Sequence, residues 1–276
     1  MTLRVALAQC EVSEALPSAA VLRVAGERVR AAMAAAAEAG ARVVFLPEGT
    51  LTYPHKTLLT DWSTQVAWSV LDEELREISR CAGELGVWTV VGAPHRLSDG
   101  RRPHNSLYVL SDEGTLVTRY DKRRLSTTEV TQLYTPGTEP GVVEVDGFRI
   151  GVVLCLETLF PELFVSYALD GCDLVVVASA PDAGFHRMCA GHAAMNAMNV
   201  GLCVAASDAD GSRSGVWSMF GSVARADTSG PALVVADIDH ALTGPGRDFH
   251  RLARTGELYA GRHAPDDPRS RDRQSF

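Results

Sequence analysis

A single cysteine, Cys155, stands at the end of an apolar, β-branched run that is typical of a strand buried on both faces. The pattern after it predicts a helix over residues 161–169, with a proline in the first turn, where no N–H is needed. Cys155 is therefore expected at a strand-to-helix turn, close to backbone N–H groups that lack helical partners. Such groups favour a thiolate and can stabilise an oxyanion. The alternative is that Cys155 is a small buried hydrophobic residue, as most free cysteines are.

Two charged residues also follow predicted strands. Glu48 comes directly after the apolar run 43–46, where a carboxylate is costly unless it is paired or exposed. Lys122 follows a strand predicted over 115–120 and begins a run of three cations. Such a run usually forms a solvated surface; the alternative is that Lys122 points inward. Strand ends of one sheet can meet at one pocket. Together these side chains would supply a thiol nucleophile, a carboxylate to take its proton and a cation to hold an oxyanion.

The composition limits the class of protein. The chain has 276 residues, of which 46% are apolar and 22% charged, enough for one large α/β domain or two small ones. A formal net charge of −8 without a basic stripe argues against a nucleic-acid partner. Six cysteines without Cys-x-x-Cys pairs argue against structural zinc and suit a reducing compartment. Because no signal peptide or membrane-spanning run is found, we expect a cytoplasmic protein with no membrane partner.

The elements that would position these residues alternate between strands and helices, with hairpins between them. Strands are predicted over 4–9, 43–46, 87–92, 173–178 and 202–206, and helices over 21–38, 72–85, 161–169 and 185–199. Hairpins are predicted for 105–110 with 115–120, 142–145 with 148–154, and 220–226 with 232–238. This pattern favours an α/β sandwich with mixed sheets inside and helices outside. We expect one domain over 1–263 and a polar tail over 264–276.

Other catalytic motifs are missing from the sequence. It has no Gly-x-Gly-x-x-Gly after a strand, no phosphate-binding loop and no Gly-x-Ser-x-Gly turn. His186 and His192 are six positions apart, so they do not share a helix face on which a metal could bind. We therefore expect neither a metal nor a cofactor. A Cys–His pairing stays open, because any of eight histidines could approach Cys155 in space.

Three segments together resemble the nitrilase superfamily of carbon–nitrogen hydrolases. They are Leu46-Pro47-Glu48, Tyr120-Asp121-Lys122-x-x-Leu125 and Val153-Leu154-Cys155-x-Glu157-x-x-Phe160-Pro161-Glu162. Their order and spacing match the Glu–Lys–Cys triad of that family, and the resemblance extends over nearly the whole chain. It implies a four-layer αββα sandwich that is doubled by association of subunits, so we expect a homodimer or a higher homo-oligomer.

The resemblance also implies a role for each residue. Cys155 would attack the substrate carbon to form a thioester, and Glu48 would act as general base. Lys122 and the backbone N–H of Leu156 would stabilise the oxyanion, while Glu129 would lie beside the lysine and position the substrate. We expect substrate contacts from Tyr53, Leu156, Glu157, Ala180 and Phe185.

The sequence departs from the family pattern at three places. Leu156 replaces a residue that is commonly aromatic, and Glu157 replaces the aspartate of small amidases. The family's Arg-Ala-x-Glu-Asn appears as His192-Ala193-Ala194-Met195-Asn196, which loses both charges on a helix that often borders the active site. Since the triad itself is kept, we expect an active enzyme.

Phe160-Pro161-Glu162 resembles the small amidase and ω-amidase branches more than the true nitrilases. We therefore expect hydrolysis of a small linear carboxamide to an acid and ammonia through a Cys thioester acyl-enzyme. Hydrolysis of an N-carbamoyl group or a nitrile, acyl transfer to an amine and a non-catalytic scaffold stay open as alternatives. Specificity is expected from the loops 51–68, 127–135 and 181–186. Four aromatic residues could wall an apolar pocket or pack on the body: Trp62, Trp68, Tyr134 and Phe185.

Overall fold

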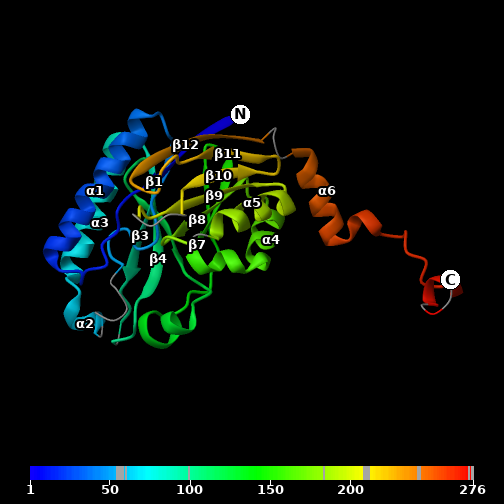
Figure 1. Cartoon of the computed structure of the whole chain (residues 1–276), viewed down its shortest axis with the longest axis horizontal. Helices are drawn as coiled ribbons and strands as arrows, with labels where there is room; N and C mark the ends of the chain where they lie inside the picture. Colours follow the sequence, from blue (N-terminus) through cyan, green and yellow to red (C-terminus); the bar gives the residue numbers. More distant parts are fainter. Residues whose placement is uncertain are drawn as a thin grey trace.

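Two six-stranded β-sheets form the centre of the molecule, and helices cover the outer face of each (Figure 1). The computed structural model describes residues 1–53, 59, 61–98, 100–182, 184–207, 212–240, 244–272 and 274. The first sheet has the strand order β12-β1-β2-β3-β4-β5, and the second has the order β11-β10-β9-β8-β7-β6. The expected α/β sandwich with four αββα layers is confirmed.

The bounds of the elements agree closely with the predicted periodicities over most of the chain. The strands of the first sheet are β1 (Thr2–Gln9), β2 (Val43–Phe45), β3 (Trp88–His95), β4 (His104–Leu110), β5 (Leu116–Asp121) and β12 (Ala232–Asp239). Those of the second are β6 (Gly141–Val145), β7 (Phe148–Leu154), β8 (Leu174–Ser179), β9 (Asn199–Val204), β10 (Gly215–Ser218) and β11 (Gly221–Arg225). The helices are α1 (Ala19–Glu38), α2 (Trp62–Gln65), α3 (Trp68–Leu85), α4 (Pro161–Leu169), α5 (Phe185–Asn196), α6 (Gly244–Thr255) and α7 (Pro268–Arg271), with short helical turns η1 (Glu129–Leu133), η2 (Cys155–Leu159) and η4 (Glu257–Tyr259).

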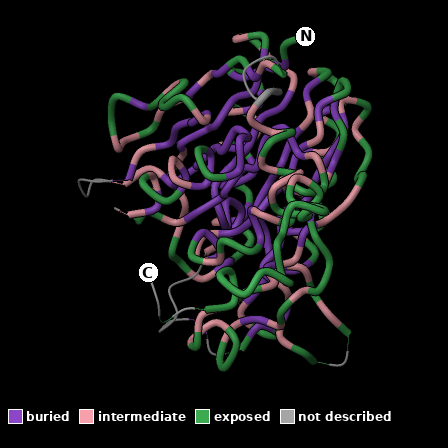
Figure 2. The backbone as a smooth tube through the Cα atoms, turned by 90° about the vertical axis from the view of Figure 1, so that its right-hand side faces the viewer, coloured by how far each residue is buried: buried purple, intermediate pink, exposed green. Residues whose placement is uncertain are grey.

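Side-chain alternation along the strands divides the core into layers. On β1, Leu3, Val5 and Leu7 belong to the apolar cluster between the two sheets. Ala6 and Ala8, one position out of phase, belong to the cluster under α1 and α3. A third cluster lies between the second sheet and the helices α4 and α5. Figure 2 shows the result, with buried strands running through the centre and exposed backbone on the outside.

The last predicted hairpin is wrong. Residues 232–238 do not pair with residues 220–226, because β12 crosses to the first sheet and pairs antiparallel with β1. β11 instead pairs with β10, a short strand that the sequence did not reveal. The side chain of Gln9 fixes the crossover by donating to the carbonyls of Thr228 and Gly230. The physical reason is that β12 supplies hydrogen-bond partners to the backbone groups on the open edge of β1, along eight residue pairs.

One helical prediction also needs correction, and the helix α6 was missed. The helix predicted over 185–199 ends at Asn196, because Ala197 takes a left-handed conformation and the chain turns directly into β9 at Asn199. The helix α6 was not predicted, since it has few apolar residues. It is held to the body by polar contacts: Arg247 pairs with Asp173 at 2.7 Å, and Arg254 donates to the carbonyl of Met195.

The last part of the chain extends away from the sandwich beyond α6 (Figure 1). Residues 264–272 and 274 are all exposed, and four of them form the short helix α7. Along the part of the chain that the structure describes, no helix combines the length and the apolar character needed to cross a bilayer.

Candidate active site

Cys155 lies between strand β7 and the turn η2, as predicted for a strand-to-helix turn. Its backbone has φ of 48°, a left-handed conformation that a residue with a side chain adopts only at a cost of about 1–2 kcal/mol. The turn is held in place from within, because the hydroxyl of Thr158 donates to the carbonyl of Cys155 at 2.6 Å. The strained turn lifts the thiol out of the strand and into a cavity.

A buried lysine lies between two glutamates at the bottom of this cavity. The ammonium of Lys122 donates to Glu48 Oε1 at 2.8 Å and to Glu129 Oε1 at 2.6 Å. Lys122 is 1% exposed, so its charge requires these partners. Glu129 comes from the π-helical turn η1, and its second oxygen accepts from the backbone N–H of Ser126 at 2.7 Å. The three side chains thus form one charged group with a net negative charge.

Glu48 is fixed by contacts from both sheets. It follows β2 in the first sheet, and Asn105 of β4 donates to its Oε1 at 2.8 Å. The backbone N–H of Ala180, just after β8 in the second sheet, donates to its Oε2 at 3.3 Å. The predicted residue Ala180 therefore contacts the carboxylate of Glu48. Strand ends from both sheets converge here, whereas the sequence analysis expected the ends of a single sheet to meet.

The electrostatics of the site keep the thiol neutral and the lysine charged. Burial and the neighbouring Glu48 carboxylate raise the pKa of the Cys155 thiol to about 12, although Lys122 and Ser179 act in the opposite direction. Burial opposes the charge of Lys122, but Glu48, Cys155 and Glu129 raise its pKa well above its usual value. A thiolate at Cys155 would thus require a base to remove the proton, and Glu48 is a buried carboxylate that interacts with this thiol.

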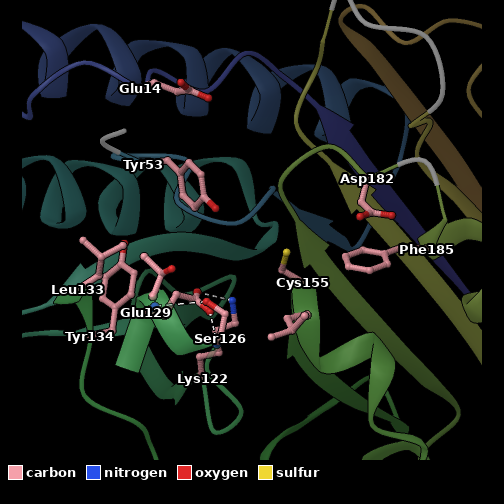
Figure 3. A pocket seen from close by; sticks show the side chains of 12 residues that line it. Glu14, Tyr53, Lys122, Ser126, Glu129, Leu133, Tyr134, Cys155, Asp182 and Phe185 are labelled. Carbon is pink, nitrogen blue, oxygen red and sulfur yellow. Dashed lines mark hydrogen bonds and ion pairs between the residues drawn. The ribbon is translucent and has the colours of Figure 1, made fainter. Parts of the chain in front are cut away.

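The cavity in front of Cys155 has a volume of about 430 Å³ (Figure 3). The residues singled out from sequence that line it are Tyr53, Lys122, Glu129, Tyr134, Cys155, Leu156 and Phe185. The lining residues that the sequence analysis did not single out are Glu14, Ser126, Thr128, Leu133 and Asp182. Thr128, Leu133 and Asp182 fall in loops expected to set specificity, whereas nothing in the sequence around Glu14 pointed to the site. Among the described lining residues there is no histidine that could pair with the thiol.

Glu157 lies behind the cavity and does not line it, in contrast to the expected substrate contact. It is 0% exposed, and both carboxylate oxygens accept from the hydroxyl of Tyr120 at 2.7 Å. The backbone N–H groups of Arg123 and Arg124 donate to one oxygen, and that of Leu154 donates to the other. Because every contact is internal, this carboxylate joins the loop of Lys122 to the turn of Cys155.

The aromatic residues divide between the cavity and the layer behind it. Tyr134 and Phe185 line the cavity. Trp62 packs behind Tyr134, with ring centroids 5.4 Å apart, and its indole N–H donates to the carbonyl of Leu133 at 2.8 Å. Trp68 packs in turn against Trp62. Of the loops expected to set specificity, residues 54–58, 60 and 183 lie outside the described residues.

The altered segment on α5 supports the turn that carries Cys155 from behind. The ring of His192 stacks on Phe164 of α4 at 3.7 Å between centroids, and its Nε2 lies 2.9 Å from the carbonyl of Thr158. Asn196 donates to the backbone carbonyl of His192, whereas Met195 is exposed. A neutral ring thus replaces the family's arginine in contact with η2.

Comparison with known proteins assigns the chain to a family. Residues 4–248 match the family described as Carbon-nitrogen hydrolase. The chain is 29% identical over 273 residues to Hydrolase Rv0480c from Mycobacterium tuberculosis, covering 89% of this chain and 92% of that protein. It is 28% identical over 222 residues to Omega-amidase NIT2 from Danio rerio, covering 74% of this chain and 78% of the relative.

A solved structure agrees in fold. A mutant of the amidase from Nesterenkonia sp. AN1, with the acetamide moiety of fluoroacetamide covalently added at its active-site cysteine, superimposes with a TM-score of 0.77. The two chains are 20% identical, and the match covers 94% of this chain and 95% of the other. By sequence and by fold, the chain belongs to the carbon–nitrogen hydrolase family of the nitrilase superfamily.

Proposed function

We propose that this chain hydrolyses a small linear carboxamide to a carboxylic acid and ammonia through a thioester on Cys155. The observation that carries the proposal is the buried Glu48–Lys122–Glu129 group directly beneath a cysteine in a strained turn. A carboxylate, an ammonium and a thiol in one enclosed site supply the base, the oxyanion partner and the nucleophile of an acyl transfer.

In the first half-reaction, Glu48 takes the thiol proton of Cys155 while the sulfur attacks the amide carbon. The base is required because a thiol with a pKa of about 12 is almost entirely protonated at neutral pH. The carbonyl oxygen becomes an oxyanion between the Lys122 ammonium and the backbone N–H of Leu156, which lies in the first turn of η2. An ammonium has three donors, and two of those of Lys122 go to glutamates, which leaves one for the oxyanion.

The intermediate then collapses as the C–N bond breaks. The leaving nitrogen receives the proton held by Glu48 and departs as ammonia, and the acyl group stays on Cys155 as a thioester. In the second half-reaction Glu48 accepts a proton from water while the water oxygen attacks the thioester carbon. The acid leaves, the proton returns to the sulfur, and the enzyme is restored.

The test is ammonia release from small carboxamides, N-carbamoyl amino acids and nitriles by the wild-type protein and by Cys155→Ala. Cys81→Ala is the matched control, since Cys81 is a half-buried free cysteine on α3, outside the cavity. We expect release from carboxamides that is lost in Cys155→Ala and kept in Cys81→Ala.

Other outcomes would redirect the proposal. Release from nitriles or N-carbamoyl compounds alone would change the substrate class. A Cys155 acyl adduct that is discharged by an added amine and not by water would indicate acyl transfer. Failure to release ammonia and to form an adduct with any compound would contradict catalysis and leave the scaffold alternative.

A further inference from the structure

Within the proposed amide hydrolysis, we infer that the substrate's acyl part is neutral or positively charged, and that amides carrying a carboxylate are disfavoured. The inference rests on the proposed function and specifies the chemical class of its substrate. It follows from the charges of the residues that line the cavity and from which of these residues are exposed.

The described residues around the cavity carry a marked excess of negative charge. Glu14, Glu129 and Asp182 line it, and Glu48 lies beneath it. Lys122 is the one cation among the described lining residues, and its ammonium is already bonded to two carboxylates. A substrate carboxylate would therefore enter a site with three formal negative charges in excess and find no described cation free to pair with it.

Two of these carboxylates are at the mouth of the cavity, where a distal group of the substrate would lie. Glu14 and Asp182 are exposed, in contrast to the buried glutamates at the bottom. Figure 3 shows Asp182 with Phe185 on one side of Cys155, while Tyr53, Leu133 and Tyr134 lie on the other. Asp182 is oriented by the backbone N–H of Gly184, which donates to its Oδ1 at 2.7 Å.

The walls between the mouth and Cys155 are largely apolar. Tyr53, Leu133, Tyr134, Leu156 and Phe185 supply aromatic and aliphatic surface to these walls. An amide that reaches from Cys155 to the mouth thus needs an apolar spacer. At its far end an ammonium or guanidinium would meet Asp182 or Glu14, with the ring of Phe185 as a further favourable surface. An uncharged substrate would meet no penalty.

The experiment uses three amides that share a four-carbon chain: butanamide, 4-aminobutanamide and the monoamide of succinic acid. We expect kcat/KM to be at least about tenfold higher for the cationic amide than for the anionic amide at low ionic strength, with a smaller ratio in 0.5 M salt. The double variant Glu14→Gln with Asp182→Asn should bring the ratio close to one. Glu11→Gln is the matched control, because Glu11 is exposed on the same loop but pairs with Arg28 and does not line the cavity. It should leave both the activity and the ratio unchanged.

Binding of the same three amides to Cys155→Ala separates this inference from the proposed function. Tighter binding of the cationic amide than of the anionic amide, measured by calorimetry, supports the inference. If the wild-type protein then releases no ammonia from any of the three amides, only the proposed function is overturned. Hydrolysis of butanamide together with equal or better binding and turnover of the anion would overturn the inference and leave the proposed function intact.

Discussion

Two buried glutamates, Glu48 and Glu157, lie on either side of the turn that carries Cys155. Both are carboxylates shielded from solvent, but they contact different partners. Glu48 is 1% exposed and Glu157 is 0% exposed, and both carboxylates are surrounded by hydrogen-bond donors. Glu48 faces an ammonium and a thiol, groups between which a proton can move. Glu157 faces a tyrosine hydroxyl and three backbone N–H groups, none of which lies in the cavity. Burial and charge alone therefore do not distinguish the base that we propose, Glu48, from a structural support such as Glu157, whereas their hydrogen-bond partners do.

The two regions depend on each other. Tyr120 is the penultimate residue of β5 in the first sheet, and Leu154 ends β7 in the second. The carboxylate of Glu157 bonds to both, so it holds the lysine loop and the cysteine turn at a fixed separation. The distances within the reactive group should thus change when the support behind it is altered.

The largest effect is expected from Glu48→Gln. Amide hydrolysis should fall by about 10³-fold or more, because the variant has no base for either half-reaction. The same change removes a negative charge that raises the pKa of Cys155, so the thiol should become more acidic. Alkylation of Cys155 by iodoacetamide, followed by peptide mass at several pH values, should shift to lower pH while turnover is lost.

Glu144→Gln provides the control for this prediction, since Glu144 is an exposed glutamate on β6. It should alter neither the alkylation profile nor turnover. If Glu48→Gln kept its activity, or if its alkylation profile moved to higher pH, the assignment of Glu48 as the base beside the thiol would be wrong.

A smaller but still large effect is expected from Glu157→Gln. The amide has one acceptor oxygen in place of two and presents its NH₂ to backbone donors, so the free energy of unfolding should fall by about 2–4 kcal/mol. In the folded fraction, kcat should fall roughly 10–100-fold with little change in KM, because the reacting groups shift relative to one another while the cavity walls stay.

The control is Glu157→Asp, which keeps the charge and should recover part of both losses. The rate of Cys155 alkylation is measured per folded molecule, so a loss of stability does not change it, whereas a shift of the groups around the thiol does. If kcat per folded molecule matched the wild type in both variants, Glu157 would support the fold without positioning the site.

The smallest effect concerns His192 behind the cysteine turn. Burial lowers its pKa, so the unfolded chain binds this proton more readily than the folded one. Stability is then fully present above the unfolded pKa of about 6.5 and declines as the pH falls below it. His192→Gln, whose side-chain NH₂ can still donate to the carbonyl of Thr158, should reduce the fall of Tm between pH 7 and pH 5 by about 2 °C. An unchanged slope would place the pH dependence on other histidines.

Much of the fold and the central chemistry could be predicted from local pattern. The apolar runs before Glu48 and Cys155 predict the strands β2 and β7, because side-chain burial repeats within a few residues. The motifs around Glu48, Lys122 and Cys155 also indicated three groups that could react together. The structure brings them together, and Glu129 lies beside the lysine as the resemblance implied.

Features that depend on distant parts of the chain were missed or misplaced. The sequence of β12 fits a hairpin with β11 as well as it fits β1, and the choice depends on which open strand edge lies nearby in the folded sandwich. Glu157 resembles a substrate ligand in the motif, but its contacts to Tyr120 and Leu154 exist only after two sheets have packed. The carboxylates of Glu14 and Asp182 line one cavity although they are 168 positions apart in the sequence.

Local sequence thus specifies the types of the side chains in the candidate site and the elements that carry them, because backbone preference and apolar periodicity act over a few residues. Long-range packing places Glu48 next to the thiol, places Glu157 behind the turn and sets which charged residues line the cavity. Those roles follow from burial and from partners contributed by other strands, and these non-local contacts are set only when the two sheets pack together.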